Sequence, residues 1–299
     1  MADNIASPDI GLSAPAKLNL YLHVLGKRGD GYHFLDSLVA FASLSDTLCF
    51  RPARPLQLSV SGPFAAALGE MPEAENIVLR AARRLAEFAS VQQGAAIALT
   101  KNLPVAAGIG GGSADAAAAL LGLARLWKLR IETEEMARLG LALGADVPVC
   151  LEGRATFVGG IGERLTPAAG LAPAGLLLVN PGLPLSTAAV FRAHGGRYSA
   201  AAPMAAVPAD AEALAQFLSM RRNDLTEAAM GLLPAIGEVL EAIGQSNGCL
   251  LARMSGSGPT CFGLYRDQAA AEIAAASIRR GPGWWVAPGA LLADGAVSG

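Results

Sequence analysis

The regular pattern of the chain starts near its N-terminus, where apolar and polar residues alternate. Every second residue from 18 to 24 is apolar, and Lys17, Asn19, Tyr21 and His23 stand between them. This period of two is typical of a strand with one buried face. Residues 1–12, which precede it, are expected to form a loose arm.

Most of the remaining chain divides into segments with the period of a strand or of a helix. Strands are expected at 35–41, 47–50, 55–64, 95–100 and 175–180, twice within 249–265 around a turn at 255–258, and at 284–287. Apolar residues at helical spacing predict helices at 75–90, 113–129, 133–143, 208–222, 224–231, 234–245 and 266–279. Residues 154–164 are expected to form a turn-rich connection, and the Pro- and Gly-containing stretch 165–175 a linker.

The length and the order of these segments indicate two domains. A chain of 299 residues is long for one compact core. The change in amino-acid composition at the linker predicts a domain boundary between residues 1–168 and residues 169–299. In the second half a strand, helices, two strands, a helix and a last strand fit an α+β layer.

Composition and charge narrow the class of protein further. Hydrophobic residues make up 53% of the chain, which favours a well-packed globular enzyme over a disordered chain. The net charge of −2 gives no reason to expect nucleic acid or an anionic membrane surface as a partner. The four cysteines are far apart and lack the paired spacing of a zinc site, so reduced core residues are expected.

No targeting signal is expected from the sequence. Its N-terminus is acidic and shows no basic region followed by an apolar one, so no signal peptide is expected. No run of about eighteen apolar residues is free of charges or glycine clusters, so no transmembrane span is expected. These features favour a cytoplasmic protein.

The segment 101–121, KNLPVAAGIGGGSADAAAALL, carries the strongest chemical signal. Four glycines within 108–112 lead directly into an Ala-rich helix, with Ser113 and Asp115 expected in its N-cap and first-turn region. Glycine lets backbone amides turn inward and approach a ligand closely. A helix N-terminus adds unpaired N–H groups and about half a positive charge. Loop and helix start together predict an anion site, most simply for phosphate.

This motif differs from two common phosphate-binding patterns. No Gly-Lys-Ser/Thr follows the glycines, so it is not a Walker A loop. The third glycine of a dinucleotide fingerprint would fall at position 113, which is Ser. A flexible loop before a packed helix is the alternative, but the density of glycines and the serine-led helix favour phosphate.

Several other polar residues have both a functional and an ordinary structural interpretation. Lys17 is either a solvated edge lysine or a functional cation. Tyr32 and His33 follow a glycine-rich turn at 26–31, and either complete that turn or stack on a flat ring and hydrogen-bond its polar edge. Asp146, expected between a helix and an apolar strand, either caps that junction or acts as a base or metal ligand near the phosphate site.

Two further positions fit the starts of helices. Asn76 precedes the helix at 75–90 closely enough to cap it, and Ser186 and Thr187 fit the first residues of another helix. Capping is the ordinary role for all three.

Four segments together resemble the GHMP kinase superfamily. They are PAKLNLYLHVLGKRGDGYH (15–33), LPVAAGIGGGSADAAAAL (103–120), GADVPV (144–149) and RMSGSGPTCF (253–262). The resemblance spans about residues 13–290, nearly the whole chain. The glycine motif by itself is typical of the superfamily. The combination of AKLNL, DGYH and GADVPV is similar to the branch whose substrate is a cytidyl diphosphate of methylerythritol.

The resemblance implies a fold and an activity. Residues 1–168 would form an N-terminal nucleotide-binding α/β domain and residues 169–299 a ferredoxin-like α+β domain, with the active site in the cleft between them. The activity implied is ATP-dependent phosphorylation of the substrate's 2-hydroxyl, with Mg²⁺ bridging the phosphates and no protein ligand of the metal identified. A monomer or a homodimer is expected, with a small-molecule substrate.

The resemblance also implies roles for individual residues. Asp146 would be the general base, and Lys17 would pair with it and offset developing negative charge. The residues implied in ATP binding are Asn76, Lys101, Pro104, Ala106, Ala107, Gly108, Ile109, Gly110, Gly111, Gly112, Ser113 and Asp115. The residues implied in substrate binding are Asn19, Tyr32, His33, Thr187, Gly256, Ser257 and Gly258. Tyr32 would stack on the cytosine while His33 hydrogen-bonds its edge, and Asp115 is either a first-turn cap or a nucleotide contact.

Two other functions compete with this one. The chain could be a sibling small-molecule kinase that acts on homoserine, mevalonate or a sugar. It could also be a non-catalytic nucleotide-binding sensor that kept the fold. The presence of both Lys17 and Asp146 argues against the sensor.

Overall fold

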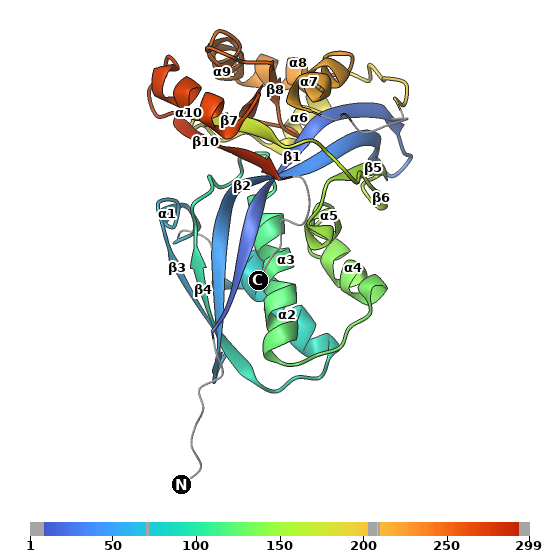
Figure 1. Ribbon diagram of the computed structural model, residues 1–299. Helices are drawn as coiled ribbons and strands as arrows, with labels where there is room; N and C mark the ends of the chain where they lie inside the picture. Colours follow the sequence, from blue (N-terminus) through green and yellow to red (C-terminus); the bar gives the residue numbers. More distant parts are fainter. Residues whose placement is uncertain (1–8, 70–71, 203–207, 209, 293–299) are drawn as a thin grey trace.

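The computed structural model describes residues 9–69, 72–202, 208 and 210–292, and within them the strands join into one sheet (Figure 1). The strands are β1 (Ile10–Lys27), β2 (His33–Ala53), β3 (Gln57–Ser61), β4 (Gly94–Thr100), β5 (Thr156–Gly160), β6 (Arg164–Pro167), β7 (Ala174–Asn180), β8 (Leu251–Met254), β9 (Cys261–Tyr265) and β10 (Trp285–Leu292). Their main order is β3-β4-β2-β10-β7-β9-β8, with β1 and β5 also paired to β2, and β6 paired to β5.

The helices flank this sheet in two groups (Figure 1). They are α1 (Ala66–Gly69), α2 (Ile77–Phe88), α3 (Gly111–Leu126), α4 (Thr133–Leu141), α5 (Val147–Glu152), α6 (Thr187–Ala193), α7 (Ala211–Ser219), α8 (Thr226–Leu232), α9 (Ala235–Gly244) and α10 (Gln268–Ser277), with a short 3-10 turn at Glu73–Glu75.

The long antiparallel pair β1–β2 connects the two parts of the molecule. One end of β2 pairs with β4 in the lower part of Figure 1, and the other end pairs with β5. In its middle, Phe41 and Ala42 pair with the C-terminal strand β10. The β1–β2 register shifts at three places, the first between Pro15 and Lys17. Such irregularities bend a strand and increase its twist, which lets this pair reach both parts.

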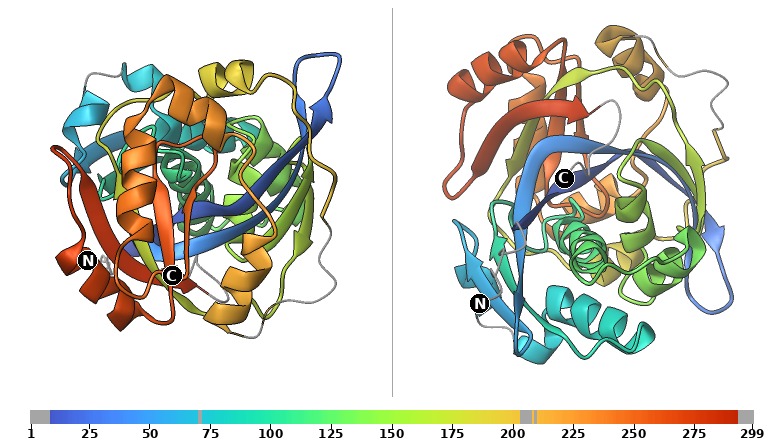
Figure 2. Two further views of the ribbon diagram at one scale, coloured as in Figure 1. Left: turned by 90° about the horizontal axis from the view of Figure 1, so that it is seen from above. Right: turned by 60° about the horizontal axis from the view of Figure 1, so that its bottom comes forward.

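The N-terminal part packs its helices against β1, β2 and β4. Figure 2 (right) shows α3 in the middle of this part, with strands on one side and α4 and α5 on the other. The alanines of α3 allow the strands to approach closely. A Cβ added to Gly122 would lie 2.2 Å from an atom of the Phe50 ring, so this close approach requires glycine. Because α3 is packed tightly against the strands, the loop that leads into it is also held close to them.

The C-terminal part is an antiparallel layer of β10, β7, β9 and β8 in which α9 and α10 contact the strands. Strand β7 is buried along its whole length, as expected for its unbroken apolar sequence. This layer is the α+β arrangement predicted from the sequence. The boundary after residue 168 stays a prediction.

Three predictions of local structure were wrong. Residues 147–152 form the helix α5 rather than a strand, since Pro148 lies in the first turn and Gly153 ends the helix in the left-handed region. The expected turns and linker at 154–175 contain β5 and β6, because Leu35–Val39 on β2 offer an edge to pair with. The expected arm at 1–12 gives way to β1 from Ile10 onward, and residues 1–8 lie outside the described ranges.

Two global expectations can be compared with the structure. All four cysteines are free thiols, and Cys150 and Cys261 are buried. In the described ranges, none of the helices combines the length and the apolar character needed to cross a bilayer.

Candidate active site

The glycine loop between β4 and α3 adopts a backbone that requires glycine at two positions. Gly108 and Gly110 have φ angles of +72° and +63°, in the left-handed region. A Cβ on Gly108 would lie 2.3 Å from the carbonyl oxygen of Gly258, and one on Gly110 would lie 3.0 Å from the Cβ of Lys17. Glycine therefore lets the loop touch both the N-terminal strand and the third glycine motif.

Helix α3 begins at the end of this loop, with Gly110 as its N-cap and no side chain capping it. The unpaired first N–H groups of a helix form an anion site of the kind predicted here. Ser113, expected in the N-cap and first-turn region, is the third helical residue; it lies in the first turn and lines the cleft, but it does not cap the helix. Asp115 does not cap the helix either, because its carboxylate accepts a hydrogen bond from Lys101.

A cleft of about 1040 Å³ opens beside the loop. Its volume is at the upper end of the usual range for ligand sites, roughly 300–1,000 Å³. The predicted site residues that line it are Lys17, Asn19, Tyr32, His33, Asn76, Lys101, Pro104, Ala106, Ala107, Gly108, Gly110, Gly111, Gly112, Ser113, Asp115, Asp146, Thr187, Gly256 and Ser257. Ile109 and Gly258 do not line it: Ile109 O accepts a hydrogen bond from the Lys17 N–H, and Gly258 lies against Gly108.

Lys17 and Asp146 form an ion pair in this cleft. The Lys17 Nζ lies 2.8 Å from Asp146 Oδ2 and also donates a hydrogen bond to Asn19 Oδ1 at 3.0 Å. The lysine side chain is 4% exposed and the aspartate side chain 51%. The Lys17 backbone N–H donates to Ile109 O at 2.8 Å, which ties this strand to the glycine loop. The ammonium is thus held firmly while the carboxylate faces the open cleft.

The third glycine motif locks the loop to β1. Ser255 Oγ accepts a hydrogen bond from the Asn19 N–H at 3.2 Å and donates one to Gly108 O at 3.1 Å. Thr260 N–H donates to Ala107 O at 3.1 Å. In the C-terminal part, the hydroxyls of Thr187 and Ser257 are 2.8 Å apart, and both residues line the cleft. Segments far apart in the sequence therefore meet around one loop.

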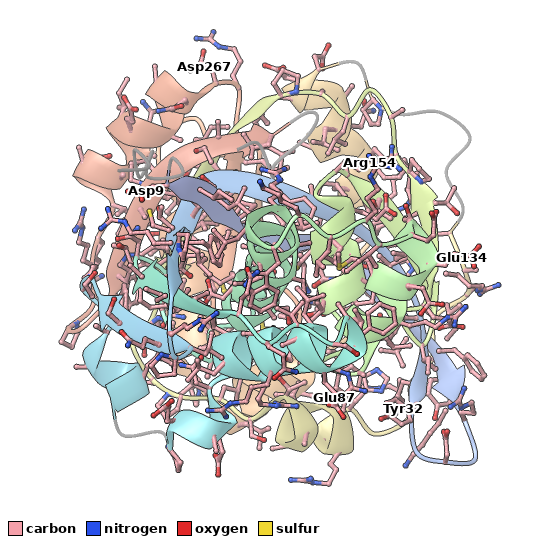
Figure 3. The ribbon with its side chains drawn as sticks, turned by 90° about the horizontal axis from the view of Figure 1, so that it is seen from below. Asp9, Tyr32, Glu87, Glu134, Arg154 and Asp267 are labelled. Atoms are coloured by element: carbon pink, nitrogen blue, oxygen red, sulfur yellow. The ribbon has the colours of Figure 1, made fainter. Side chains whose placement is uncertain are left out.

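Aromatic side chains gather at the opposite end of the cleft. Tyr32 lies on the β1–β2 turn at the edge of the molecule (Figure 3), is 58% exposed, and has the Arg28 guanidinium 5.7 Å from its ring centre. The His33 ring stacks on Phe191, with centroids 5.0 Å apart. Burial, together with the charges of Lys27 and His194, lowers the pKa of His33. A neutral imidazole both donates and accepts hydrogen bonds, which suits the edge of a heterocyclic base.

Asn76 and Lys101 lie on the other side of the loop. Asn76 caps α2, since its Oδ1 accepts from Val78 N–H at 2.9 Å, so the capping role is confirmed. The Lys101 side chain is 2% exposed, and its Nζ donates to Asp46 at 2.5 Å and to Asp115 at 2.7 Å.

Several residues at this site were not identified from the sequence. Ser255 lies within the third glycine motif, so that motif was a signal for it. Ser37, whose hydroxyl accepts from Asn19 Nδ2 at 2.8 Å, and Asp46 sit in β2 with no motif around them. Phe191 lies in an ordinary helical segment, and only the fold brings it to His33.

In the part of the chain that the structure describes, no three His, Cys, Asp or Glu side chains gather into a metal-binding group. The carboxylates that line the cleft are Glu75, Asp115 and Asp146. A magnesium ion is commonly bound by one or two carboxylates together with substrate phosphates and water, so this cleft fits an ion that arrives with a nucleotide.

The chain resembles characterised families over both parts of this fold. The GHMP kinases N terminal domain matches residues 76–154, and the GHMP kinases C terminal domain matches residues 205–282. The homoserine kinase from Cytophaga hutchinsonii superposes with a TM-score of 0.69 at 19% identity, covering 95% of each chain. The fold, the glycine loop and these matches establish that the chain belongs to the GHMP kinase family.

Relatives of higher sequence identity indicate the group within the GHMP kinase family to which the chain is similar. The chain is 58% identical to the 4-diphosphocytidyl-2-C-methyl-D-erythritol kinase of Paramagnetospirillum magneticum, over 94% of this chain and 98% of the relative. It is 53% identical to the enzyme of that name from Rhodospirillum rubrum, over 94% and 92%. A crystal structure of 4-(cytidine 5'-diphospho)-2C-methyl-D-erythritol kinase superposes with a TM-score of 0.78 at 35% identity, over 94% of this chain and 99% of the other. Within the GHMP family the chain groups with these kinases, as predicted from the sequence.

Proposed function

We propose that the protein transfers the γ-phosphoryl group of ATP to the 2-hydroxyl of 4-diphosphocytidyl-2-C-methyl-D-erythritol, a step of the non-mevalonate route to isoprenoid precursors. The products are ADP and the 2-phosphate of that substrate. The observation that carries the proposal is the Lys17–Asp146 pair, which faces the cleft beside the glycine loop. The identity of 58% to a kinase of that name supports the choice of substrate.

Some residues of the cleft would position the reacting groups, and others would stabilise the charge that develops on them. Phosphoryl transfer asks the protein mainly to position the groups and to stabilise charge. The amides of the loop and the first turn of α3 would hold the triphosphate, with Asn76 on the adenine side. The Lys17 ammonium would offset the charge that develops on the moving phosphoryl group. Mg²⁺ would bind the phosphate oxygens, with water and at most one or two cleft carboxylates completing its shell.

Asp146 would act on the attacking hydroxyl. Its carboxylate is half exposed in the cleft and 2.8 Å from Lys17, so a substrate hydroxyl can reach it. It would accept the proton of that hydroxyl, or orient it for attack, while Asn19 contacts the substrate nearby. Holding hydroxyl and phosphate in line is worth roughly 7–11 kcal/mol in ideal intramolecular reactions.

The aromatic end of the cleft would recognise the cytosine. Tyr32 and Phe191 offer ring faces for stacking, and neutral His33 offers its polar edge. Thr187 and Ser257, whose hydroxyls are 2.8 Å apart in the cleft lining, would contact the substrate between the base and the reacting alcohol.

A coupled assay of ADP release tests this function. We expect turnover with the cytidyl substrate and none with unmodified methylerythritol phosphate, homoserine, mevalonate or a sugar. Turnover of one of these compounds in preference to the cytidyl substrate would indicate a sibling GHMP kinase. Nucleotide binding without ADP release from any substrate would indicate a sensor.

A further inference from the structure

A buried cluster of three ionisable side chains lies beneath the glycine loop. It consists of Asp46 on β2, Lys101 directly after β4, and Asp115 on α3, and their side chains are 0%, 2% and 3% exposed. The ammonium of Lys101 bridges the two carboxylates, at 2.5 Å from Asp46 Oδ2 and 2.7 Å from Asp115 Oδ2. Three segments distant in the sequence are thus joined by one lysine.

Asp46 holds the chain where it enters the loop. Its Oδ1 accepts hydrogen bonds from the backbone N–H groups of Asn102, at 2.6 Å, and Leu103, at 2.8 Å. Asn102 adds a bond of its own, from Nδ2 to the carbonyl of Ser45 at 3.1 Å. The two residues that precede the loop are therefore fixed to β2 through side chains as well as backbone.

The same cluster holds the chain where it leaves the loop. Asp115 is one turn into α3, and its bond to Lys101 ties that turn to Asp46. A Cβ added to Gly111, the first residue of the helix, would lie 3.3 Å from Lys101 Nζ and 3.7 Å from Asp46 Oδ2. The cluster therefore lies against the first turn of α3, whose residues Gly111, Gly112 and Ser113 line the cleft.

We propose that Asp46, Lys101 and Asp115 are positioning residues, which hold the entry and exit of the glycine loop so that its amides receive the triphosphate. This inference rests on the proposed function. It assigns Lys101 and Asp115 an indirect role: the ammonium is almost wholly buried and already donates to two carboxylates. The three residues act on ATP through the loop.

The two carboxylates have unequal tasks, and this inequality can be tested. Asp46 accepts three donors, namely two amides and one ammonium, so both of its oxygens are needed. Asp115 accepts one, and its Oδ1 is buried with no hydrogen-bond partner among the residues described. An asparagine at position 115 can keep the single bond through its carbonyl oxygen. An asparagine at position 46 turns an N–H donor toward either the ammonium or the amides.

The experiment compares Asp46→Asn, Asp115→Asn and Asp115→Leu with the wild-type protein. The readouts are the dissociation constant for ADP, measured by calorimetry, and the KM values for ATP and for the cytidyl substrate. We expect Asp46→Asn and Asp115→Leu to weaken ADP binding and raise the KM for ATP by at least about tenfold. Asp115→Asn should stay within about threefold of wild type, and the KM for the cytidyl substrate within about twofold in every variant.

Asp36→Asn is a matched control on the same strand. Asp36 accepts from Tyr21 Oη at 2.8 Å and from Ala202 N–H at 2.7 Å, and it does not line the cleft. Its loss should lower the midpoint of thermal unfolding and leave ADP binding unchanged. This control separates a general loss of stability from a loss of loop geometry.

Three results would show that these residues do not position the loop. Unchanged ADP binding in folded Asp46→Asn, equal losses in Asp46→Asn and Asp115→Asn, or a parallel rise of both KM values would overturn the proposal. If Asp46→Asn does not fold, the comparison of Asp115→Leu with Asp115→Asn decides, and equal ADP affinity in these two overturns it. A wild-type protein that binds no nucleotide would instead refute the proposed function.

Discussion

Lys17 and Asp146 come from β1 and from the residue before α5, yet their side chains meet at 2.8 Å in the cleft. The lysine is buried and held by Asn19, while half of the aspartate side chain is open to solvent. A fixed cation and an accessible carboxylate beside the glycine loop suit the proposed phosphoryl transfer to an alcohol.

Asp146→Asn should remove most of the turnover and keep nucleotide binding. The amide has nearly the shape of the carboxylate but cannot accept the proton, and general-base catalysis is typically worth about 10²–10⁴-fold. The measurement is kcat in the coupled ADP assay, with the dissociation constant for ADP as the control. A rate near that of the wild type would remove Asp146 from the mechanism.

Tyr32→Ala should raise the KM for the cytidyl substrate by about tenfold, because stacking of a base on an aromatic ring is worth about 1–3 kcal/mol. The KM for ATP should not change, since Tyr32 lies at the other end of the cleft. Phe88→Ala is a matched control, because Phe88 is 48% exposed and lies outside the cleft. An unchanged KM for the cytidyl substrate in Tyr32→Ala would refute the stacking role.

Gly108→Ala should destabilise the protein by at least about 2 kcal/mol and abolish tight ADP binding. The added Cβ would lie 2.3 Å from Gly258 O, at a φ of +72°. Gly231→Ala in α8 has an ordinary φ and nothing within 4 Å of the new atom, so it should be neutral or slightly stabilising. Urea unfolding compares the two variants, and equal stability would contradict the tight loop–motif contact.

The stability of the protein should depend on the ionisation of Asp115. Burial raises the pKa of Asp115 to about 7, against the opposing charge of Lys101. In the unfolded chain that pKa is about 3.9. Between these two values the folded state holds a proton that the unfolded state has lost, so this group lowers the free energy of unfolding as pH rises through that window.

Asp115→Asn removes this titration. The free energy of unfolding of the variant, relative to wild type, should therefore increase between about pH 5 and about pH 7 and then level off. Urea unfolding at several pH values measures the difference. A difference that stays constant across this range would show that Asp115 is ionised throughout it.

The sequence by itself determined the features that depend only on residues close together in the chain. The glycines at 108 and 110 adopt the left-handed angles that glycine permits, and Asn76 and Ser186 cap the helices that follow them. Periodicity located most strands and helices, and the motifs predicted the kinase family that the relatives confirm. Such signals can be read without the fold, because capping, turn geometry and amphipathic period depend on near neighbours.

Only the tertiary structure decided the features that depend on distant partners. The period of the short apolar run 147–152 does not separate helix from strand, so Pro148 and Gly153 mark only where a helix could begin and end, and the helix packs beside α3 and α4 in the folded chain. The strands β5 and β6 needed the open edge of β2. Likewise, nothing around Asp46 in the sequence marks it. Its role follows from a lysine and two amides that the chain brings to it across more than fifty residues, by burying charges that must find partners.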